Sequence, residues 1–126
     1  MRMKKLVLLT VLIIIFGCNK DNANIESNID GQYIGTFERN GNTSNVKLDL
    51  INGEYSGESE IVKFPAICNG SYIISSDLIK FENQCAWTAE FDWSLILSES
   101  WNYTFENNIL TMVKSNGDKY ILIKQE

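Results

Sequence analysis

The sequence contains no histidine, and this absence narrows the chemistry that the protein could perform. Histidine is the commonest general base and metal ligand, and it is the usual activator of serine and cysteine nucleophiles. Carboxylates are not expected to act as the general acid and base instead. Glu90 and Asp92 flank Phe91, and both would point outward into solvent. An acid and base pair of the glycosidase type needs a cleft and one desolvated member. We therefore expect no enzymatic activity, no catalytic residue, no metal site and no cofactor.

Basic residues are scarce as well. Lysine and arginine number 11 against 16 acidic residues, and Arg2, Lys4 and Lys5 fall in the first five positions. Without those three the chain keeps eight basic residues against 16 acidic ones, a formal net charge of −8. Such a balance lacks the basic footprint that binds phosphate backbones, so we expect no nucleic-acid partner. It suits solubility or a basic partner.

Long hydrophobic runs are limited to the N-terminus. Residues 6–16 are apolar apart from one threonine, and the run is too short to cross a bilayer in the mature protein. A basic start precedes it and Gly17-Cys18 follows, which is the layout of an export signal peptide. We expect residues 1–17 to be removed. The alternative is a buried N-terminal helix with an incidental Cys18, although nothing amphipathic follows to pack on it.

The ending Ile15-Phe16-Gly17-Cys18 resembles the bacterial lipobox, in which the cysteine is lipidated and becomes the new N-terminus. The resemblance implies a lipid on Cys18, a membrane anchor through that lipid and a place in the bacterial cell envelope, at the outer membrane. Residues 18–30 are polar and without periodicity, so we expect a flexible tether between the lipid and a domain over residues 31–126.

Cysteine is rare too, and the two that remain form a plausible pair. Cys68 and Cys85 would lie in an exported chain, where two cysteines most simply form a disulfide. A hairpin that turns at Ser76-Asp77 places them opposite each other at a non-hydrogen-bonded site, where facing side chains come closest. The same count puts four large side chains on the cysteine face of the hairpin: Tyr72, Ile74, Ile79 and Phe81.

From Gly31 onward the sequence alternates between apolar and polar residues and carries turn dipeptides. Asn40-Gly41, Asn52-Gly53 and Asn116-Gly117 are typical of type I′ hairpin turns, which need positive φ at both positions. The first two turns select the same inner face on the strand they share. The strands expected are roughly 31–39, 43–51, 54–61, 69–75, 78–84, 90–97, 101–106 with 109–115, and 118–125, which is eight, or nine if the joined pair is counted separately.

A meander of this length must bury one face, either as a closed barrel or as a sandwich. Gly35 and Gly57 fall mid-strand on the inner face, where a tightly bent barrel wall leaves no room for a side chain. The sequence therefore predicts an all-β fold: a single antiparallel meander barrel of about eight strands.

The opening Gly31-Gln-Tyr33-Ile-Gly35-Thr-Phe37 carries a resemblance. Together with the meander and the lipobox, it resembles small lipocalin-like (calycin-type) lipoproteins of Bacteroidetes-type bacteria. Its start of Gly, any residue and an aromatic is similar to the first strand of lipocalins and of avidins. The resemblance implies a lipocalin-like barrel that binds a ligand.

Aromatic residues concentrate on the predicted inner face, and this has two interpretations. One is a pocket for a small apolar ligand, and the other is a filled core, because an eight-stranded barrel is only just wide enough for its own side chains. The filled core fits a different function, a protein-binding lipoprotein such as an inhibitor or an assembly subunit. The candidate pocket residues are Tyr33, Gly35, Phe37, Ser44, Tyr55, Gly57, Trp93, Trp101 and Tyr103.

The last hairpin is apolar on both faces. A type I′ turn at Asn116-Gly117 points Leu110, Met112, Ile121 and Ile123 inward. It leaves Val113, Tyr120 and Leu122 outside, as a candidate docking patch for a protein partner or the membrane interface. The alternatives are that the tether covers this patch or that the parity of the hairpin is reversed.

Overall fold

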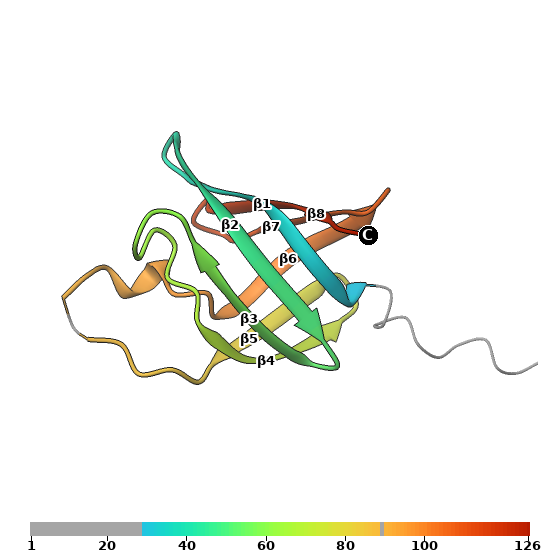
Figure 1. Ribbon diagram of the computed structural model, residues 1–126, viewed down its shortest axis with the longest axis horizontal. Coiled ribbons are helices and arrows are strands. Elements are labelled where there is room, and N and C mark those ends of the chain that lie inside the picture. Colours follow the sequence, from blue (N-terminus) through green and yellow to red (C-terminus); the bar gives the residue numbers. More distant parts are fainter. Residues whose placement is uncertain (1–28, 89) are drawn as a thin grey trace, which may run out of the picture.

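Eight strands form a closed barrel in which each strand pairs antiparallel with the next and β8 returns to β1 (Figure 1). The computed structural model describes residues 29–88 and 90–126. This architecture confirms the all-β meander barrel predicted from the sequence. Within these ranges, no helix is long and apolar enough to cross a membrane. The strands are β1 Gly31–Arg39, β2 Asn42–Ile51, β3 Glu54–Ser59, β4 Asn69–Ser75, β5 Leu78–Asn83, β6 Glu99–Glu106, β7 Ile109–Val113 and β8 Lys119–Lys124.

Two Asn-Gly turns fix the register of the first three strands. Asn40 and Gly41 have φ of 52° and 83°, and Asn52 and Gly53 have φ of 52° and 81°. These are the positive values that a type I′ turn requires, and Asn and Gly tolerate them best. The resulting pairs, among them Leu48 with Gly57, are those predicted from the sequence.

The third Asn-Gly turn differs, and it shifts the last strand by one residue. The amide of Gly117 donates to the carbonyl of Lys114 at 2.9 Å, and the amide of Lys114 donates to the carbonyl of Asp118 at 3.0 Å. The loop therefore contains three residues. Its last residue, Gly117, has the positive φ of 100° that such a loop requires. A shift of one residue turns every side chain of a strand to the opposite face.

The predicted orientation of β8 is therefore wrong. Tyr120 and Leu122 point inward, with 1% and 0% of their surfaces exposed, whereas Ile121 and Ile123 lie outside. Met112 faces Tyr120 across the hairpin.

The strand predicted over residues 90–97 is also absent. This stretch belongs to a long connection, residues 84–98, that contains the short 3-10 helix η3, Trp93–Leu95. Asp92 accepts hydrogen bonds from the backbone amide and the hydroxyl of Ser94, at 3.0 and 2.7 Å. Local bonds of this kind compete with strand pairing. β5 therefore pairs directly with β6, and Ile79 faces Trp101.

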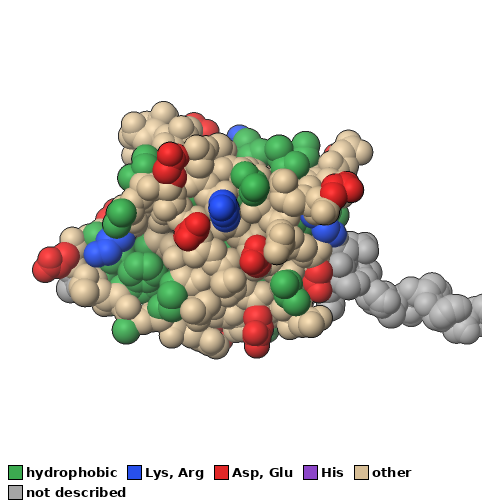
Figure 2. Space-filling view, in the orientation of Figure 1, with side chains coloured by type: hydrophobic (Ala, Val, Ile, Leu, Met, Phe, Trp, Pro, Cys, Tyr) green, Lys and Arg blue, Asp and Glu red, His purple; other side chains and the backbone are tan. Residues whose placement is uncertain are grey.

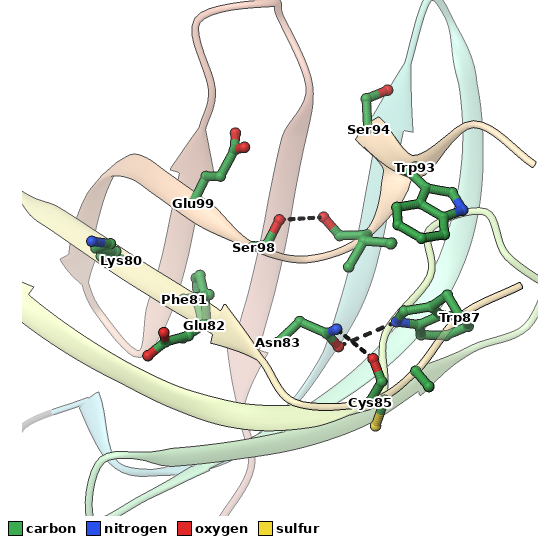
Figure 3. Close-up of a pocket in the computed structure, with 12 residues that line it drawn as sticks. Lys80, Phe81, Glu82, Asn83, Cys85, Trp87, Trp93, Ser94, Ser98 and Glu99 are labelled. Atoms are coloured by element: carbon green, nitrogen blue, oxygen red, sulfur yellow. Dashed lines mark hydrogen bonds between the residues drawn. The ribbon is translucent and has the colours of Figure 1, made fainter. Parts of the chain in front are cut away.

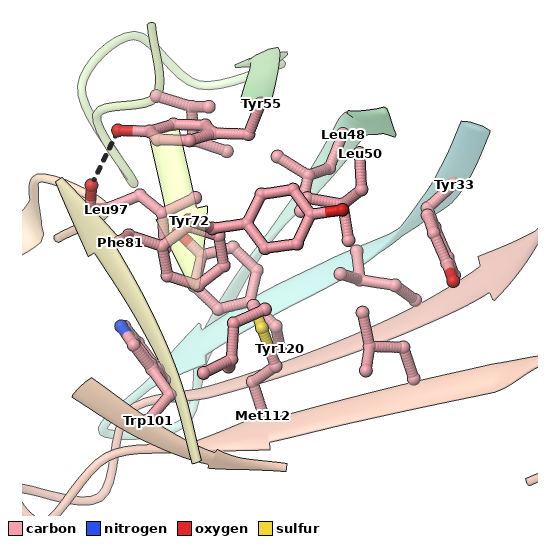
Figure 4. Close-up of a cluster of buried hydrophobic side chains, with 14 of the residues drawn as sticks. Tyr33, Leu48, Leu50, Tyr55, Tyr72, Phe81, Leu97, Trp101, Met112 and Tyr120 are labelled. Carbon is pink, nitrogen blue, oxygen red and sulfur yellow. Dashed lines mark hydrogen bonds between the residues drawn. The ribbon is translucent and has the colours of Figure 1, made fainter. Parts of the chain in front are cut away.

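Aromatic side chains fill the barrel interior (Figure 4). Ring centroids lie 5.4 Å apart for Phe64 and Phe37, 5.0 Å for Phe37 and Tyr120, and 5.1 Å for Tyr120 and Trp101. Edge and tilted ring contacts at these distances show that the rings are closely packed. It supports the filled core among the two interpretations of the inner aromatics.

The space beside the small residues of the inner face is occupied by neighbouring parts of the protein and is not open to a ligand. A side chain at Gly35 would overlap the backbone of Ile121, and one at Gly57 would overlap the backbone of Lys47. The hydroxyl of Ser44 accepts the amide of Ile61 at 3.2 Å, which draws the connection between β3 and β4 over this end of the barrel. Phe64 enters the core from the same connection.

The hairpin of β4 and β5 carries the predicted disulfide between Cys68 and Cys85, whose Cα atoms are 6.3 Å apart. The register that the sequence predicted for this hairpin is also present, since Tyr72 faces Phe81. The disulfide closes the two strands at the point where both long connections leave the barrel.

The two ends of the barrel differ in character (Figure 1). One end holds short turns and both ends of the described chain, where the amide of Gln125 donates to the carbonyl of Gln32 at 2.7 Å. The opposite end, which we call the loop-bearing end, holds the connections 60–68 and 84–98. A tether that enters at the first end would leave the loop-bearing end free.

Candidate binding cleft at the loop-bearing end

A cleft of about 760 Å³ opens outside the barrel wall, between β5, the connection 84–98 and the start of β6 (Figure 3). Figure 2 shows hydrophobic side chains gathered at the loop-bearing end of the face in view. The residues around the cleft come from β5 (Lys80, Glu82, Asn83), from the connection (Ala86, Trp87, Trp93, Ser94, Ser98) and from the first residue of β6 (Glu99).

The cleft exists because the ladder between β5 and β6 stops early. Its last pair is Phe81 with Glu99, and Glu99 has the left-handed φ of 67° that turns the chain aside. The preceding residues pair with Ala66 instead, whose amide donates to Leu95 at 2.9 Å and whose carbonyl accepts from Leu97 at 3.0 Å. The end of β5 and the chain that leads into β6 therefore diverge.

Two tryptophans stand at one end of the cleft (Figure 3). The indole N–H of Trp93 donates to the carbonyl of Thr88 at 2.7 Å, and that of Trp87 donates to the side-chain oxygen of Asn83 at 3.2 Å. These bonds hold both rings in place. Trp93 is 52% exposed, and it is the one aromatic among the exposed large hydrophobic side chains of the described residues.

The other end of the cleft carries charges of both signs. Lys80 and Glu82 project from the outer face of β5, whereas Glu99 pairs with the inward-facing Phe81 and projects from β6 on the opposite side (Figure 3). Glu99 also forms an ion pair with Lys114 at 3.3 Å, and the Lys114 ammonium lies over the Trp101 ring. This end can both donate and accept hydrogen bonds.

Arg39 anchors the wall that carries Trp93. Its guanidinium donates to the carboxylate of Asp118 at 2.7 and 2.6 Å, to Asp92 at 3.2 Å and to the carbonyl of Ser94 at 3.4 Å. The hydrogen bond to Asp118 is the main cause that raises the pKa of Arg39. The hydrogen bonds from Ser94 lower the pKa of Asp92, with a smaller contribution from Arg39. The 3-10 helix is therefore tied to the end of β1 by charge.

The structure separates the predicted pocket residues into two places. Eight of the nine belong to the barrel wall and its packed interior, and Tyr103 among them is half-buried. Trp93 was expected inside and lies outside in the cleft, because the strand that would have turned it inward does not form. The presence of Trp87 and Trp93 in one cleft was not predicted. Its only sequence signal is a long stretch between Cys85 and β6 that is rich in tryptophan and poor in turn residues.

The buried tyrosines are structural. The hydroxyls of Tyr33 and Tyr55 donate to the carbonyls of Ile29 and Leu97, at 2.7 and 3.1 Å. Burial raises the pKa of Tyr55 to about 12. Neutral, hydrogen-bonded phenols of this kind hold the core together and supply no acid or base at neutral pH.

The predicted docking patch is wrong for two of its three residues, since Tyr120 and Leu122 are buried and Val113 is half-buried. Four isoleucines form an outer apolar surface on the same three strands, which we call the isoleucine patch. Ile34 of β1 and Ile109 of β7 both pair with Ile123 of β8, and Ile121 lies two residues along. The patch comprises Ile34, Ile109, Ile121 and Ile123, each about 39–51% exposed.

Comparison of the chain with protein-family models, with curated proteins and with solved structures gives no match. Within residues 29–88 and 90–126, no group of three or more Cys, Asp or Glu is arranged to hold a metal ion. The predicted signal peptide over residues 1–17, the lipid on Cys18 and all but the last two residues of the tether lie outside the described residues.

Proposed function

We propose that this protein is a non-enzymatic, lipid-anchored binding protein of the bacterial cell envelope, which holds its ligand in the cleft outside the barrel wall. The anchor at Cys18, at the outer membrane, rests on the signal-peptide pattern of the sequence. The eight-stranded meander is compatible with a lipocalin-like barrel. A relationship to small lipocalin-like lipoproteins of Bacteroidetes-type bacteria is part of the proposal.

One observation carries the choice of site. The interior is occupied by rings in mutual contact, from Phe64 to Trp101, whereas the exposed indole of Trp93 lines a concave surface outside. Concave sites of roughly 300–1,000 Å³ are typical for small ligands, and the cleft falls within that range. The small apolar ligand expected inside the barrel would have to displace core side chains, so we favour a ligand in the cleft.

Native mass spectrometry of the full chain purified from its own cells tests the site. We expect a bound component that is lost from Trp93→Leu, which removes the ring and keeps an apolar side chain. Val62→Ala serves as the control, because Val62 is 80% exposed on the neighbouring connection and does not line the cleft. A component that stays bound to Trp93→Leu would contradict the proposed site.

The anchor is tested separately. Metabolic labelling with a fatty acid should mark the wild-type chain and not Cys18→Ala. Equal labelling of both chains would remove the lipid anchor from the proposal and leave the cleft unaffected.

A second candidate function is protein binding through the isoleucine patch, favoured by the direct contact row of Ile34, Ile123 and Ile109 across three strands. Replacing Ile121 and Ile123 with glutamate should leave the barrel folded, since both side chains point outward, and should abolish capture of a protein partner. Ile73→Glu on β4 is the matched control, because Ile73 is 66% exposed and lies outside the patch. Capture that survives the double substitution would exclude this candidate.

A further inference from the structure

We propose that the ligand of the cleft is a neutral oligosaccharide, with a sugar ring stacked on Trp93 and its hydroxyl groups hydrogen-bonded to the charged side chains of β5. This inference rests on the proposed function, because it names the chemical class that the same cleft would hold. It follows from how the two ends of the cleft differ.

The tryptophan end offers flat apolar surface and little else. The indole N–H groups of Trp87 and Trp93 are already bound to Asn83 and Thr88, so neither is available to a ligand. Phe91 packs edge-on against Trp87 with ring centroids 5.7 Å apart, which helps to fix that ring. A pyranose ring carries C–H groups on its faces, and such a face fits the negative face of an indole.

The charged end offers donors and acceptors together. Lys80 can donate and Glu82 can accept, and both side chains project from the outer face of β5 (Figure 3). A hydroxyl group donates one hydrogen bond and accepts two, so a sugar can satisfy both kinds of side chain at once. Hydrogen bonds to charged groups are the stronger ones.

Other ligand classes fit this lining less well. A wholly apolar ligand would desolvate Lys80 and Glu82 without returning hydrogen bonds, which is costly. A strongly charged ligand would meet side chains of both signs. A protein partner has a more suitable surface elsewhere, in the isoleucine patch, which faces outward and consists of four apolar side chains flanked by Lys47 and Glu106.

The test is a titration of the full chain with neutral tetrasaccharides: cellotetraose, maltotetraose, xylotetraose, mannotetraose and chitotetraose. The protein is kept in lauryldimethylamine oxide, because sugar-based detergents would compete for the site. Isothermal calorimetry should detect saturable binding of at least one tetrasaccharide at millimolar concentration. Trp93→Leu should weaken it by about tenfold or more, equivalent to about 1.4 kcal/mol.

Two further variants separate stacking from loss of fold. Trp93→Phe keeps a ring face and should retain more affinity than Trp93→Leu, and Val62→Ala should bind like the wild type. Because Trp93 is half exposed, all three should melt close to the wild-type temperature. Binding that is equal in Trp93→Leu and Trp93→Phe would overturn the stacking geometry and with it the proposal.

The result also distinguishes the inference from the function on which it rests. If no tetrasaccharide binds, and a native component is still lost from Trp93→Leu, the saccharide assignment is wrong and the cleft remains the binding site. If tetrasaccharides and the native component are both insensitive to Trp93, the cleft itself is wrong and both proposals fail.

Discussion

Arg39 and Asp118 form a two-point ion pair at the loop-bearing end, with nitrogen to oxygen distances of 2.7 and 2.6 Å. Asp118 is buried, and it lies just before β8, whereas Arg39 ends β1. The pair therefore joins the two strands that close the barrel. The same guanidinium reaches Asp92 and so also fixes the wall of the cleft.

Removal of Arg39 should cost far more stability than removal of its contact with the cleft wall. Arg39→Met leaves the Asp118 carboxylate buried without its cation, and we expect a loss of about 3 kcal/mol in the free energy of unfolding. Asp92→Asn removes only an exposed ion pair and should change the free energy of unfolding much less. Urea denaturation of both variants measures the difference, and equal losses would show that Asp118 does not depend on Arg39.

The cleft wall should loosen in acid. The pKa of Asp92 is lowered in the folded protein by Ser94 and then by Arg39, from an unfolded value of about 3.9. A lowered folded pKa means that the stabilisation is fully present above the unfolded value and is lost as pH falls through the folded value. The indole N–H signal of Trp93 should therefore shift below about pH 4 in the wild type. In Asp92→Asn this step should disappear, and an identical acid transition in that variant would assign it to another carboxylate.

Tyr120 and Tyr55 should respond in opposite ways to loss of the hydroxyl. The Tyr120 hydroxyl is buried and finds no hydrogen-bond partner among the described residues, and burial raises its pKa well above the ordinary value. Tyr120→Phe should therefore leave stability unchanged or raise it by about 1 kcal/mol. Tyr55→Phe removes a bond to the carbonyl of Leu97 and should cost about 1 kcal/mol. Thermal melts compare the two, and an equal cost for Tyr120→Phe would reveal a partner for its hydroxyl.

Gly35 and Gly117 test two different reasons for glycine. Gly35→Ala would drive a methyl group into the backbone of Ile121 at the seam between β1 and β8, and we expect a loss of about 3 kcal/mol. Gly117→Ala meets no atom within 4 Å and bears only the strain of a positive φ, about 1 kcal/mol. Chemical denaturation should rank the two in that order. The reverse ranking would mean that β1 and β8 can move apart at little cost to accept the methyl group.

Turn chemistry explains both the success and the failure of the sequence-based register. At Asn40-Gly41 and Asn52-Gly53 the dipeptide forms the two-residue turn that it most often indicates, and alternation then assigns every inner residue of β1 to β3. At Asn116-Gly117 the same dipeptide fits a three-residue loop. Because both faces of that hairpin are apolar, the hydrophobic pattern could not choose between the two registers.

The cleft could not be predicted for a related reason. Residues 90–97 alternate between polar and apolar residues like a strand. Periodicity alone does not reveal that β5 pairs directly with β6, so that residues 90–97 are excluded from the sheet. The contacts that hold this segment join Arg39 to Asp92, which are 53 positions apart, and no local pattern indicates them. The disulfide was predictable because Cys68 and Cys85 lie in one hairpin, where counting residues across a single turn is enough.

The three tryptophans of the chain offer the most direct test of binding outside a filled barrel. Their indole N–H groups give three signals in a ¹H–¹⁵N spectrum, which single Trp→Phe variants assign. Trp87 and Trp93 line the cleft, whereas Trp101 is buried and donates to the carbonyl of Ser98 at 3.0 Å. When the component recovered from the protein's own cells is added back, we expect the signals of Trp87 and Trp93 to shift and that of Trp101 to stay in place. A shift confined to Trp101 would place the ligand inside the barrel and contradict the account.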